Sequence, residues 1–157
     1  MGILFNTVSI CQFMVVGDQP SKDLYEWASD RLSKSSFNSI DNTTEEVSSG
    51  WVHLDDSNEN SFAFPRAFWR DHYLGFTLRR DQRRVPSVVF KAYLKNAERE
   101  FLASHPGMGR VPKQKREELS EAVRAALFAK TLPVPSTYDV VWDTHSGLVT
   151  FASLSPK

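Results

Sequence analysis

The chain is 157 residues long, carries 19 Lys and Arg against 19 Asp and Glu, and is 41% hydrophobic and 12% aromatic. Such a chain is long enough to bury the core of one domain, and its aromatic content excludes a disordered polymer. A single cysteine, Cys11, excludes an internal disulfide and a cysteine-rich metal site, and its apolar surroundings favour a reduced thiol in the cytoplasm. No apolar run is long enough to span a bilayer, so no membrane contact is expected.

The first half of the chain predicts strands around one helix. β-Branched and large apolar residues over 3–16 indicate one long strand or two short ones. Residues 21–32 have helical periodicity, with Ser21 placed to cap the helix. A short strand is predicted at 50–54. The remaining segments are a polar loop at 33–49, an acidic loop at 55–60 and an aromatic-rich stretch at 61–69 that is assigned to no element.

The second half of the chain predicts a strand, two helices and a strand hairpin. Residues 73–79 and 138–143 alternate in side-chain character, as half-buried strands do, and 148–152 returns beside the latter after a turn. Between these strands, residues 86–130 have the pattern of two helices. The predicted order is therefore β, α, β, β, α, α, β, β. Because strands and helices do not alternate strictly, this order indicates an α+β fold with an antiparallel or mixed sheet.

The helical stretch 86–130 predicts an antiparallel hairpin of two helices. Pro86 and Pro112 open the helices, and two prolines after residue 130 end the second one. Each helix has its apolar residues on one stripe. The stripes are Phe90, Leu94, Ala97 and Phe101 in the first helix and Leu119, Val123, Ala126 and Leu127 in the second. We expect these stripes to pack together in a projecting tip.

Positive charge is concentrated between residues 79 and 130. This stretch holds 13 Lys and Arg and 6 Asp and Glu, a formal charge of +7, so the rest of the chain sums to −7. On the first helix Lys91, Lys95 and Arg99 recur every fourth residue and share one face. A concentrated positive field attracts an extended polyanion whatever the total charge of the protein. The expected fold is thus α+β with a projecting basic helical hairpin.

The residues expected to contact the polyanion are cations at the start of this stretch and along its helices. They are Arg79, Arg80, Arg83, Arg84, Lys91, Lys95, Arg99, Lys113, Lys115 and Arg116. The chain has no stacking set of aromatics beside them, no zinc finger and no helix-turn-helix pattern, so contacts to phosphates are expected in place of contacts to base edges. Such binding is independent of sequence and strongly dependent on salt. The alternative interpretation of these charges is a solvated helix surface.

No residue pattern in the sequence indicates catalysis. The four histidines are far apart and lack metal-ligand spacing, and no glycine-rich phosphate loop or nucleophile elbow is present. Asp55, Asp56 and Glu59 have the chemistry of nuclease metal ligands, but their Ser and Asn neighbours favour a solvated turn. We therefore expect no enzyme activity, no metal and no cofactor.

Several segments of the chain, taken in order, form a specific set. They are Gly50-Trp51-Val52, Leu78-Arg79-Arg80-Asp81, Arg83-Arg84-Val85-Pro86, residues 113–118, Leu132-Pro133-Val134-Pro135 and Tyr138-Asp139-Val140-Val141-Trp142-Asp143. This set resembles the RdgC family of bacterial recombination-associated proteins. The resemblance covers nearly the whole chain, with residues 1–157 as a single RdgC-like domain and 86–130 as its helical tip. Family members continue past the position of Lys157, so a short member or an N-terminal fragment is expected.

The resemblance implies a protein of the nucleoid that binds double-stranded DNA with little sequence preference and restrains RecA-dependent recombination. It also implies a ring-shaped homodimer with a positively charged hole. Two alternatives stay open: a protein-interaction or dimerisation module without DNA contact, and, with the least support, a metal-dependent exonuclease. Exposure of Phe90, Leu94 and Phe101 would favour the first alternative. DNA cleavage that disappears on substitution of Asp55 or Asp56 would favour the second.

Overall fold

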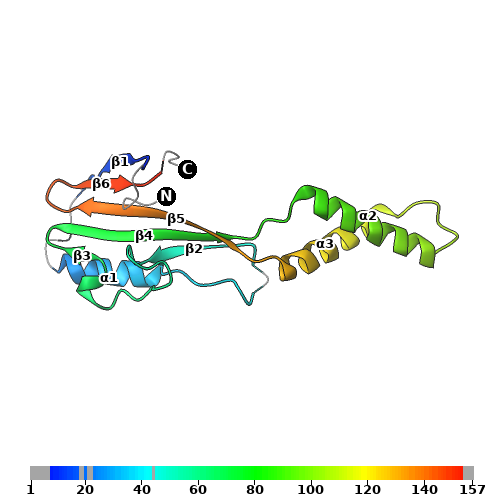
Figure 1. Cartoon of the computed structure of the whole chain (residues 1–157), viewed down its shortest axis with the longest axis horizontal. Coiled ribbons are helices and arrows are strands. Elements are labelled where there is room, and N and C mark those ends of the chain that lie inside the picture. The colour runs from blue at the N-terminus through cyan, green and yellow to red at the C-terminus, as the bar shows by residue number, and fades with distance from the viewer. Residues whose placement is uncertain (1–7, 18–19, 21–22, 44, 154–157) are drawn as a thin grey trace. The chain divides into compact units, whose positions relative to one another are not determined.

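The computed structural model describes residues 8–17, 20, 23–43 and 45–153, and its elements are shown in Figure 1. The described helices are α1 (Leu24–Lys34), α2 (Ser87–Ser104), α3 (Lys113–Lys130) and the short 3₁₀ helix η1 (Pro65–Ala67). The described strands are β1 (Cys11–Met14), β2 (Val47–Val52), β3 (Trp69–Arg70), β4 (Tyr73–Gln82), β5 (Val134–Asp143) and β6 (Leu148–Phe151). This combination of elements confirms the predicted α+β class.

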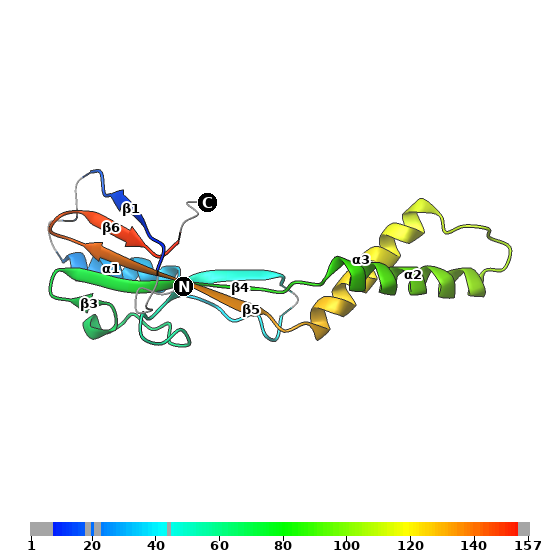
Figure 2. The same cartoon turned by 45° about the horizontal axis from the view of Figure 1, so that its top comes forward.

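The described strands form one sheet in the order β1-β6-β5-β4-β2, with β3 paired beside β4. The pairs β1/β6, β5/β6 and β3/β4 are antiparallel, and the arrows of β4 and β5 point in opposite directions in Figure 1. The predicted hairpin of β5 and β6 is confirmed, with Val140 opposite Phe151 and Asp143 opposite Leu148. Figure 2 shows α1 lying along the sheet.

The turn between β5 and β6 is held by the carboxylate of Asp143. It accepts hydrogen bonds from the backbone N–H of His145 (2.9 Å) and from the hydroxyl of Ser146 (2.7 Å). The hydroxyl of Ser146 is the main reason why the pKa of Asp143 lies below its ordinary value, because it stabilises the ionised form. Gly147 follows with a φ of 73°, a left-handed conformation that glycine adopts without strain.

The hydrophobic core lies between α1 and the sheet. Its buried cluster consists of Ala28 and Leu32 from α1 with Phe62, Phe68 and Leu74. The two α1 residues are four positions apart and therefore face the same way, which agrees with the predicted periodicity. Phe62 and Phe68 belong to the stretch that the sequence left unassigned. They are 1% and 2% exposed, so this stretch contributes large apolar area to the core with little regular structure.

Contacts along the backbone divide the chain into two compact units. The first unit comprises Ser48–Asp81 with the described residues before 40 and after 134, and it holds α1 and nearly all of the sheet. The second unit comprises Ile40–Val47 and Gln82–Val134, and it holds α2 and α3. The sequence predicts the helical tip within a single domain, and the structure adds the segment before β2 to the unit that contains the tip.

Some boundaries differ from those predicted. Helix α1 begins at Leu24, after Asp23 with a φ of 52°; the predicted cap, Ser21, lies outside the described residues, as do residues 3–7 of the predicted first strand. Strand β2 begins at Val47, inside the predicted polar loop. Strand β5 begins at Val134, before the predicted position.

Strand β4 extends three residues beyond the predicted end at Arg79. Among the added residues, Asp81 is buried and pairs with Arg79, as described below. Across the described residues, none of the helices combines the length and the apolar character needed to cross a bilayer.

Candidate nucleic-acid interface

Helices α2 and α3 pack against each other, as the sequence predicts. The stripe residues Phe90, Leu94 and Phe101 are partly buried. The rings of Phe90 and Phe101 also contact cations of α3. The guanidinium of Arg124 lies 5.6 Å from the ring centre of Phe90, and Nζ of Lys115 lies 5.8 Å from that of Phe101. The two helices are therefore joined by apolar and cation–π contacts, and the predicted stripe of α2 is mostly used within the hairpin.

Side chains alternate between interior and solvent at the end of β4 and just after it. Asp81 and Arg83 are 1% and 3% exposed, and the side chain of Arg79 is 15% exposed. Arg80 and Arg84 are exposed. An extended chain turns successive side chains to opposite sides. The four arginines predicted as one cationic cluster therefore separate into two that turn inward, partly buried Arg79 and buried Arg83, and two that are exposed.

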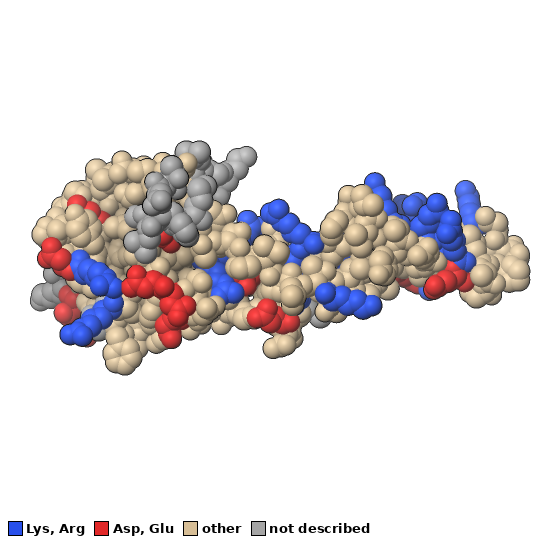
Figure 3. Space-filling view, in the orientation of Figure 1, with Lys and Arg blue, Asp and Glu red and all other residues tan. Residues whose placement is uncertain are grey.

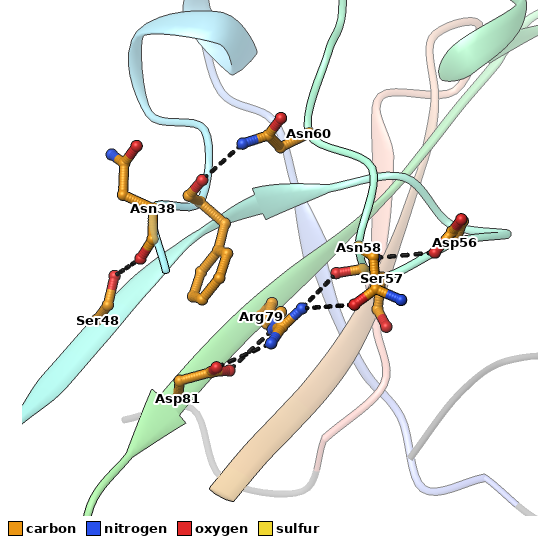
Figure 4. A network of polar contacts seen from close by, with 9 residues as sticks. Asn38, Ser48, Asp56, Ser57, Asn58, Asn60, Arg79 and Asp81 are labelled. Carbon is orange, nitrogen blue, oxygen red and sulfur yellow. Dashed lines mark hydrogen bonds and ion pairs between the residues drawn. The ribbon is translucent and has the colours of Figure 1, made fainter. Parts of the chain in front are cut away.

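Arg79 is held within a network of protein oxygens, shown in Figure 4. Its Nε and Nη2 each donate a hydrogen bond of 2.8 Å to the carboxylate of Asp81, in a bidentate pair. Its Nη1 donates to the carbonyl oxygen of Ser57 (2.9 Å) and to the side-chain oxygen of Asn58 (3.1 Å). The guanidinium also lies 4.4 Å from the ring centre of Phe37. All three nitrogens of Arg79 are thus occupied by the protein.

The ring of Phe37 reaches Arg79 because the chain around it lies directly against β2. The N–H of Phe37 donates to the carbonyl oxygen of Trp51 (3.0 Å), and the N–H of Trp51 donates to that of Ser35 (2.9 Å). Gly50 leaves room for this approach, since a Cβ at that position would overlap the backbone of Phe37. Glycine is therefore required between these two backbones.

Arg83 organises the segment before β2 in its own unit. Its Nη1 donates to the carbonyl oxygens of Thr43 (2.6 Å) and Glu45 (3.2 Å). Its Nη2 donates to those of Ile40 (2.8 Å) and Asp41 (3.0 Å). A buried guanidinium must have acceptors, and four backbone carbonyls supply them here. One side chain thereby fixes a segment that has no regular structure.

The predicted set of DNA contacts must be corrected at Arg79 and Arg83. The side chain of Arg79 is 15% exposed and Arg83 is 3% exposed. The nitrogens of Arg79 and both Nη atoms of Arg83 donate to protein oxygens, so we remove the two residues from the candidate interface. Arg84 keeps its place in the set: its Nε and Nη2 lie 3.2 Å from the amide oxygen of Gln82, and the side chain is exposed. Arg80 is exposed as well, but it belongs to the first unit.

Helix α2 carries the predicted row of cations on its surface. Lys91, Lys95 and Arg99 are exposed, and no ion pair forms to them from the residues that the structure describes. Their spacing of four residues places them on one face, about 6 Å apart along the axis. Figure 3 shows lysine and arginine side chains on the visible face of the hairpin, with a smaller acidic group beside them.

The predicted cations of α3 are partly paired. Nε of Arg116 lies 2.7 Å from the carboxylate of Glu98 on α2, and Nζ of Lys115 lies 2.8 Å from that of Glu118. The side chain of Arg116 is still 64% exposed, and exposed pairs of this kind contribute little to stability. Lys113 is exposed, and none of the described carboxylates pairs with it.

An open hollow of about 1100 Å³ lies between the end of α2 and the start of α3. Arg110, Lys113 and Arg116 line it, with Glu98 as the one acid among the lining residues. Arg110 is exposed and was not among the predicted contacts. The signal that points to it is its position in the glycine-containing connector of two helices that both carry cations.

The formal charge of the helical stretch is smaller than the linear count suggested. Residues 86–130 hold nine Lys and Arg and five Asp and Glu, a charge of +4. The second unit also includes three acids before β2, so it holds 11 Lys and Arg and 8 Asp and Glu, or +3, against −3 for the first unit. Folding therefore reduces the contrast of +7 and −7 that the sequence shows.

The acidic loop after β2 is built as a turn. Asp55 accepts a hydrogen bond of 2.9 Å from Arg70. Asp56 and Glu59 accept hydrogen bonds from backbone N–H groups two residues further along the chain, at 2.9 and 3.0 Å. Within the described ranges, no group of three or more His, Cys, Asp or Glu is arranged to hold a metal ion.

Comparisons of this chain with models of known protein families and with curated proteins found no match. The resemblance to the RdgC family therefore stays a prediction from the sequence. The functional conclusion depends on the arrangement of charge on the hairpin.

Proposed function

We propose that this chain binds double-stranded DNA through its phosphate backbone, without sequence preference. One observation supports the proposal most directly: the second unit carries exposed cations, on the α2–α3 hairpin and just before it, that form no ion pair with a described carboxylate. They are Arg84, Lys91, Lys95, Arg99, Arg110 and Lys113. The RdgC resemblance supports the same conclusion, and with it a role on the nucleoid, as a homodimer, in restraining RecA-dependent recombination.

The row of Lys91, Lys95 and Arg99 provides one positive charge about every 6 Å along α2. Duplex DNA provides one negative charge about every 1.7 Å along its axis. The number of contacts is therefore set by the protein and hardly changes with the base sequence. The residues of the hairpin form neither a zinc finger nor a helix-turn-helix, the motifs that contact base edges, so we expect weak discrimination between DNA sequences.

The decisive measurement is the affinity for a labelled duplex at several salt concentrations. Each phosphate contact contributes a slope of about −0.9 to log K against log salt, so roughly six contacts give a slope near −5. The variant Lys91→Gln/Lys95→Gln/Arg99→Gln should reduce the slope by about 3 and weaken all duplex sequences equally.

A matched control removes three cations from the first unit, as Lys34→Gln/Arg66→Gln/Arg70→Gln. The net charge changes by the same amount in both variants, so only a site on the hairpin distinguishes them. Equal losses in the two variants would refute the proposal. So would a loss confined to one DNA sequence, because phosphate contacts are common to all.

A second candidate function is a protein-interaction or dimerisation surface, and one observation favours it. Val89 and Tyr93, four residues apart on α2 and outside the predicted apolar stripe, are 39% and 51% exposed. The uncharged change Tyr93→Ser would reduce the solution mass of an assembly that uses this face and leave the DNA salt slope unchanged. Incubation of DNA with the protein and Mg²⁺ tests the third alternative, since a nuclease leaves shortened products.

A further inference from the structure

A pocket of about 340 Å³ opens in the first unit between α1 and the face of the sheet. Trp27 and Arg31 line it from α1, Trp51 from β2, Phe76 from β4 and Trp142 from β5. Its volume lies at the lower end of the range for small-ligand sites, which are mostly apolar with a few polar groups. No residue of the proposed DNA interface takes part in it.

The walls of the pocket are flat aromatic surfaces. Trp51 and Phe76 meet edge to face, with ring centres 4.9 Å apart and an interplanar angle of 84°. Trp27 is 41% exposed, which is high for a side chain with this much apolar area. Partly exposed indoles at a concave site present faces on which a planar ring can stack.

The ring of Trp142 is held differently from that of Trp69. Nε1 of Trp69 donates to the carbonyl oxygen of Asp71 at 2.6 Å. Nε1 of Trp142 is buried and finds no acceptor within the described part of the chain. Buried donors are nearly always paired. The described chain therefore supplies no hydrogen-bond acceptor to Nε1 of Trp142, in contrast to Trp69.

Arg31 is the charged residue among those that line the pocket, and its guanidinium can accept a ligand as its ion-pair partner. Its guanidinium lies 6.0 Å from the ring centre of Trp27 and is exposed. The neighbouring acid, Asp30, pairs with Lys34 at 2.7 Å, and no described carboxylate pairs with Arg31. A planar guanidinium beside an aromatic face is suited to bind a carboxylate bidentately.

We propose that this pocket binds a small aromatic carboxylic acid. The aromatic ring lies among the indoles of Trp27, Trp51 and Trp142, and the carboxylate pairs with Arg31. This ligand satisfies both features of the site, since an uncharged aromatic leaves Arg31 without a partner and a polar anion leaves the indoles exposed. The inference goes beyond DNA binding and does not depend on it.

The direct test titrates the full chain with 2-naphthoate and, separately, with the neutral 2-naphthalenemethanol, at constant ionic strength. The chain has four tryptophans, so its indole N–H signals in an NMR spectrum report on the pocket separately from the rest. We expect naphthoate to shift the signals of Trp27, Trp51 and Trp142 and to leave that of Trp69 in place. Shifts of Trp69 alone, or no saturable shift of any indole, would overturn the proposal.

Two exposed residues allow the contributions to be separated without disturbing the core. Arg31→Gln should weaken naphthoate about tenfold and leave the weak binding of the alcohol unchanged. Arg66→Gln removes the same charge from an exposed position of the first unit outside the pocket lining, and should have little effect. Trp27→Ala should weaken both probes. Equal affinity of the unaltered chain for acid and alcohol, or equal effects of Arg31→Gln and Arg66→Gln, would contradict a carboxylate site.

Discussion

The end of β4 and the helical hairpin use the same kinds of cation in opposite ways. At the end of β4, Arg79 has all three nitrogens hydrogen-bonded to protein oxygens and is 15% exposed. On the hairpin, Lys91 and Lys95 are exposed and form no ion pair with a described carboxylate. The first kind of cation stabilises the fold and the second is available to a ligand, so a count of positive charges does not measure a binding site.

The difference follows from the two backbone periods. Along an extended chain every second side chain turns inward, so two of four closely spaced arginines point away from solvent and must find acceptors. Along a helix, residues four apart share one face, so a row of cations can remain entirely in solvent. Substitutions in the two regions should therefore affect different measurements.

The largest expected effect is on stability, from Asp81→Ala. The change leaves the guanidinium of Arg79 without its bidentate partner in a largely buried site, which should lower the free energy of unfolding by about 4 kcal/mol. Urea denaturation measures it. Asp55→Ala, which breaks the exposed pair with Arg70, is the control and should cost less than about 1 kcal/mol. Similar losses in the two variants would mean that Arg79 is not held as described.

The next largest effect on stability is expected from Arg83, in comparison with its neighbour Arg84. Arg83→Gln removes donors to four backbone carbonyls and should cost about 3 kcal/mol, since several charge-assisted hydrogen bonds are lost together. Arg84→Gln should change the stability by less than about 0.5 kcal/mol and should weaken DNA binding. Thermal unfolding and a DNA titration on both variants give the result. A stable Arg83→Gln protein with weakened DNA binding would reverse our assignment.

A third effect on stability tests the close packing of Phe37, whose ring contacts Arg79, against β2. Gly50→Ala places a Cβ against the backbone of Phe37, so the segment must move away from β2 at a cost of about 2 kcal/mol. Gly107→Ala, where a Cβ meets nothing within 4 Å, is the matched control. Denaturation midpoints of the two proteins give the comparison, and equal midpoints would show that the close approach is not a constraint.

The smallest effect on stability is expected from the row on α2. The variant Lys91→Ala/Lys95→Ala/Arg99→Ala removes exposed charges from a helix surface and introduces a residue with high helix propensity. Its free energy of unfolding should stay within about 0.5 kcal/mol of the starting protein. Circular dichroism during heating measures this. A loss of several kcal/mol would place these cations among the structural ones.

Sequence reasoning succeeded where a single period continued over a long segment. The apolar stripe through Phe90 and Leu94 was enough to predict the paired helices, and the alternation in 138–143 was enough to predict β5. It misassigned Arg79 and Arg83 because the alternation predicted for residues 73–79 has Leu74, Phe76 and Leu78 on its apolar face, which places the two arginines on the opposite, polar face. In the structure that second face is covered too, since Thr77, Asp81 and Arg83 are buried.

Other features have no local signal. The burial of Phe62 and Phe68 depends on contacts with α1 from a stretch without periodicity, and the need for Gly50 depends on a backbone that is distant in the sequence. The acids of Ile40–Val47 joined the unit of the helices through Arg83, which changed the charge balance. Such long-range partners cannot be read from residue types alone.

Strands β4 and β5 are neighbours in the sheet, although the whole α2–α3 pair separates them along the chain. The two helices are therefore an insertion between neighbouring strands, which a tight turn of a few residues can also connect. Lengthening or trimming both helices by whole turns would change the length of each helix by about 5.4 Å per turn, while the strand register stayed as it is. In this chain order, the length of the helical pair can vary independently of the sheet.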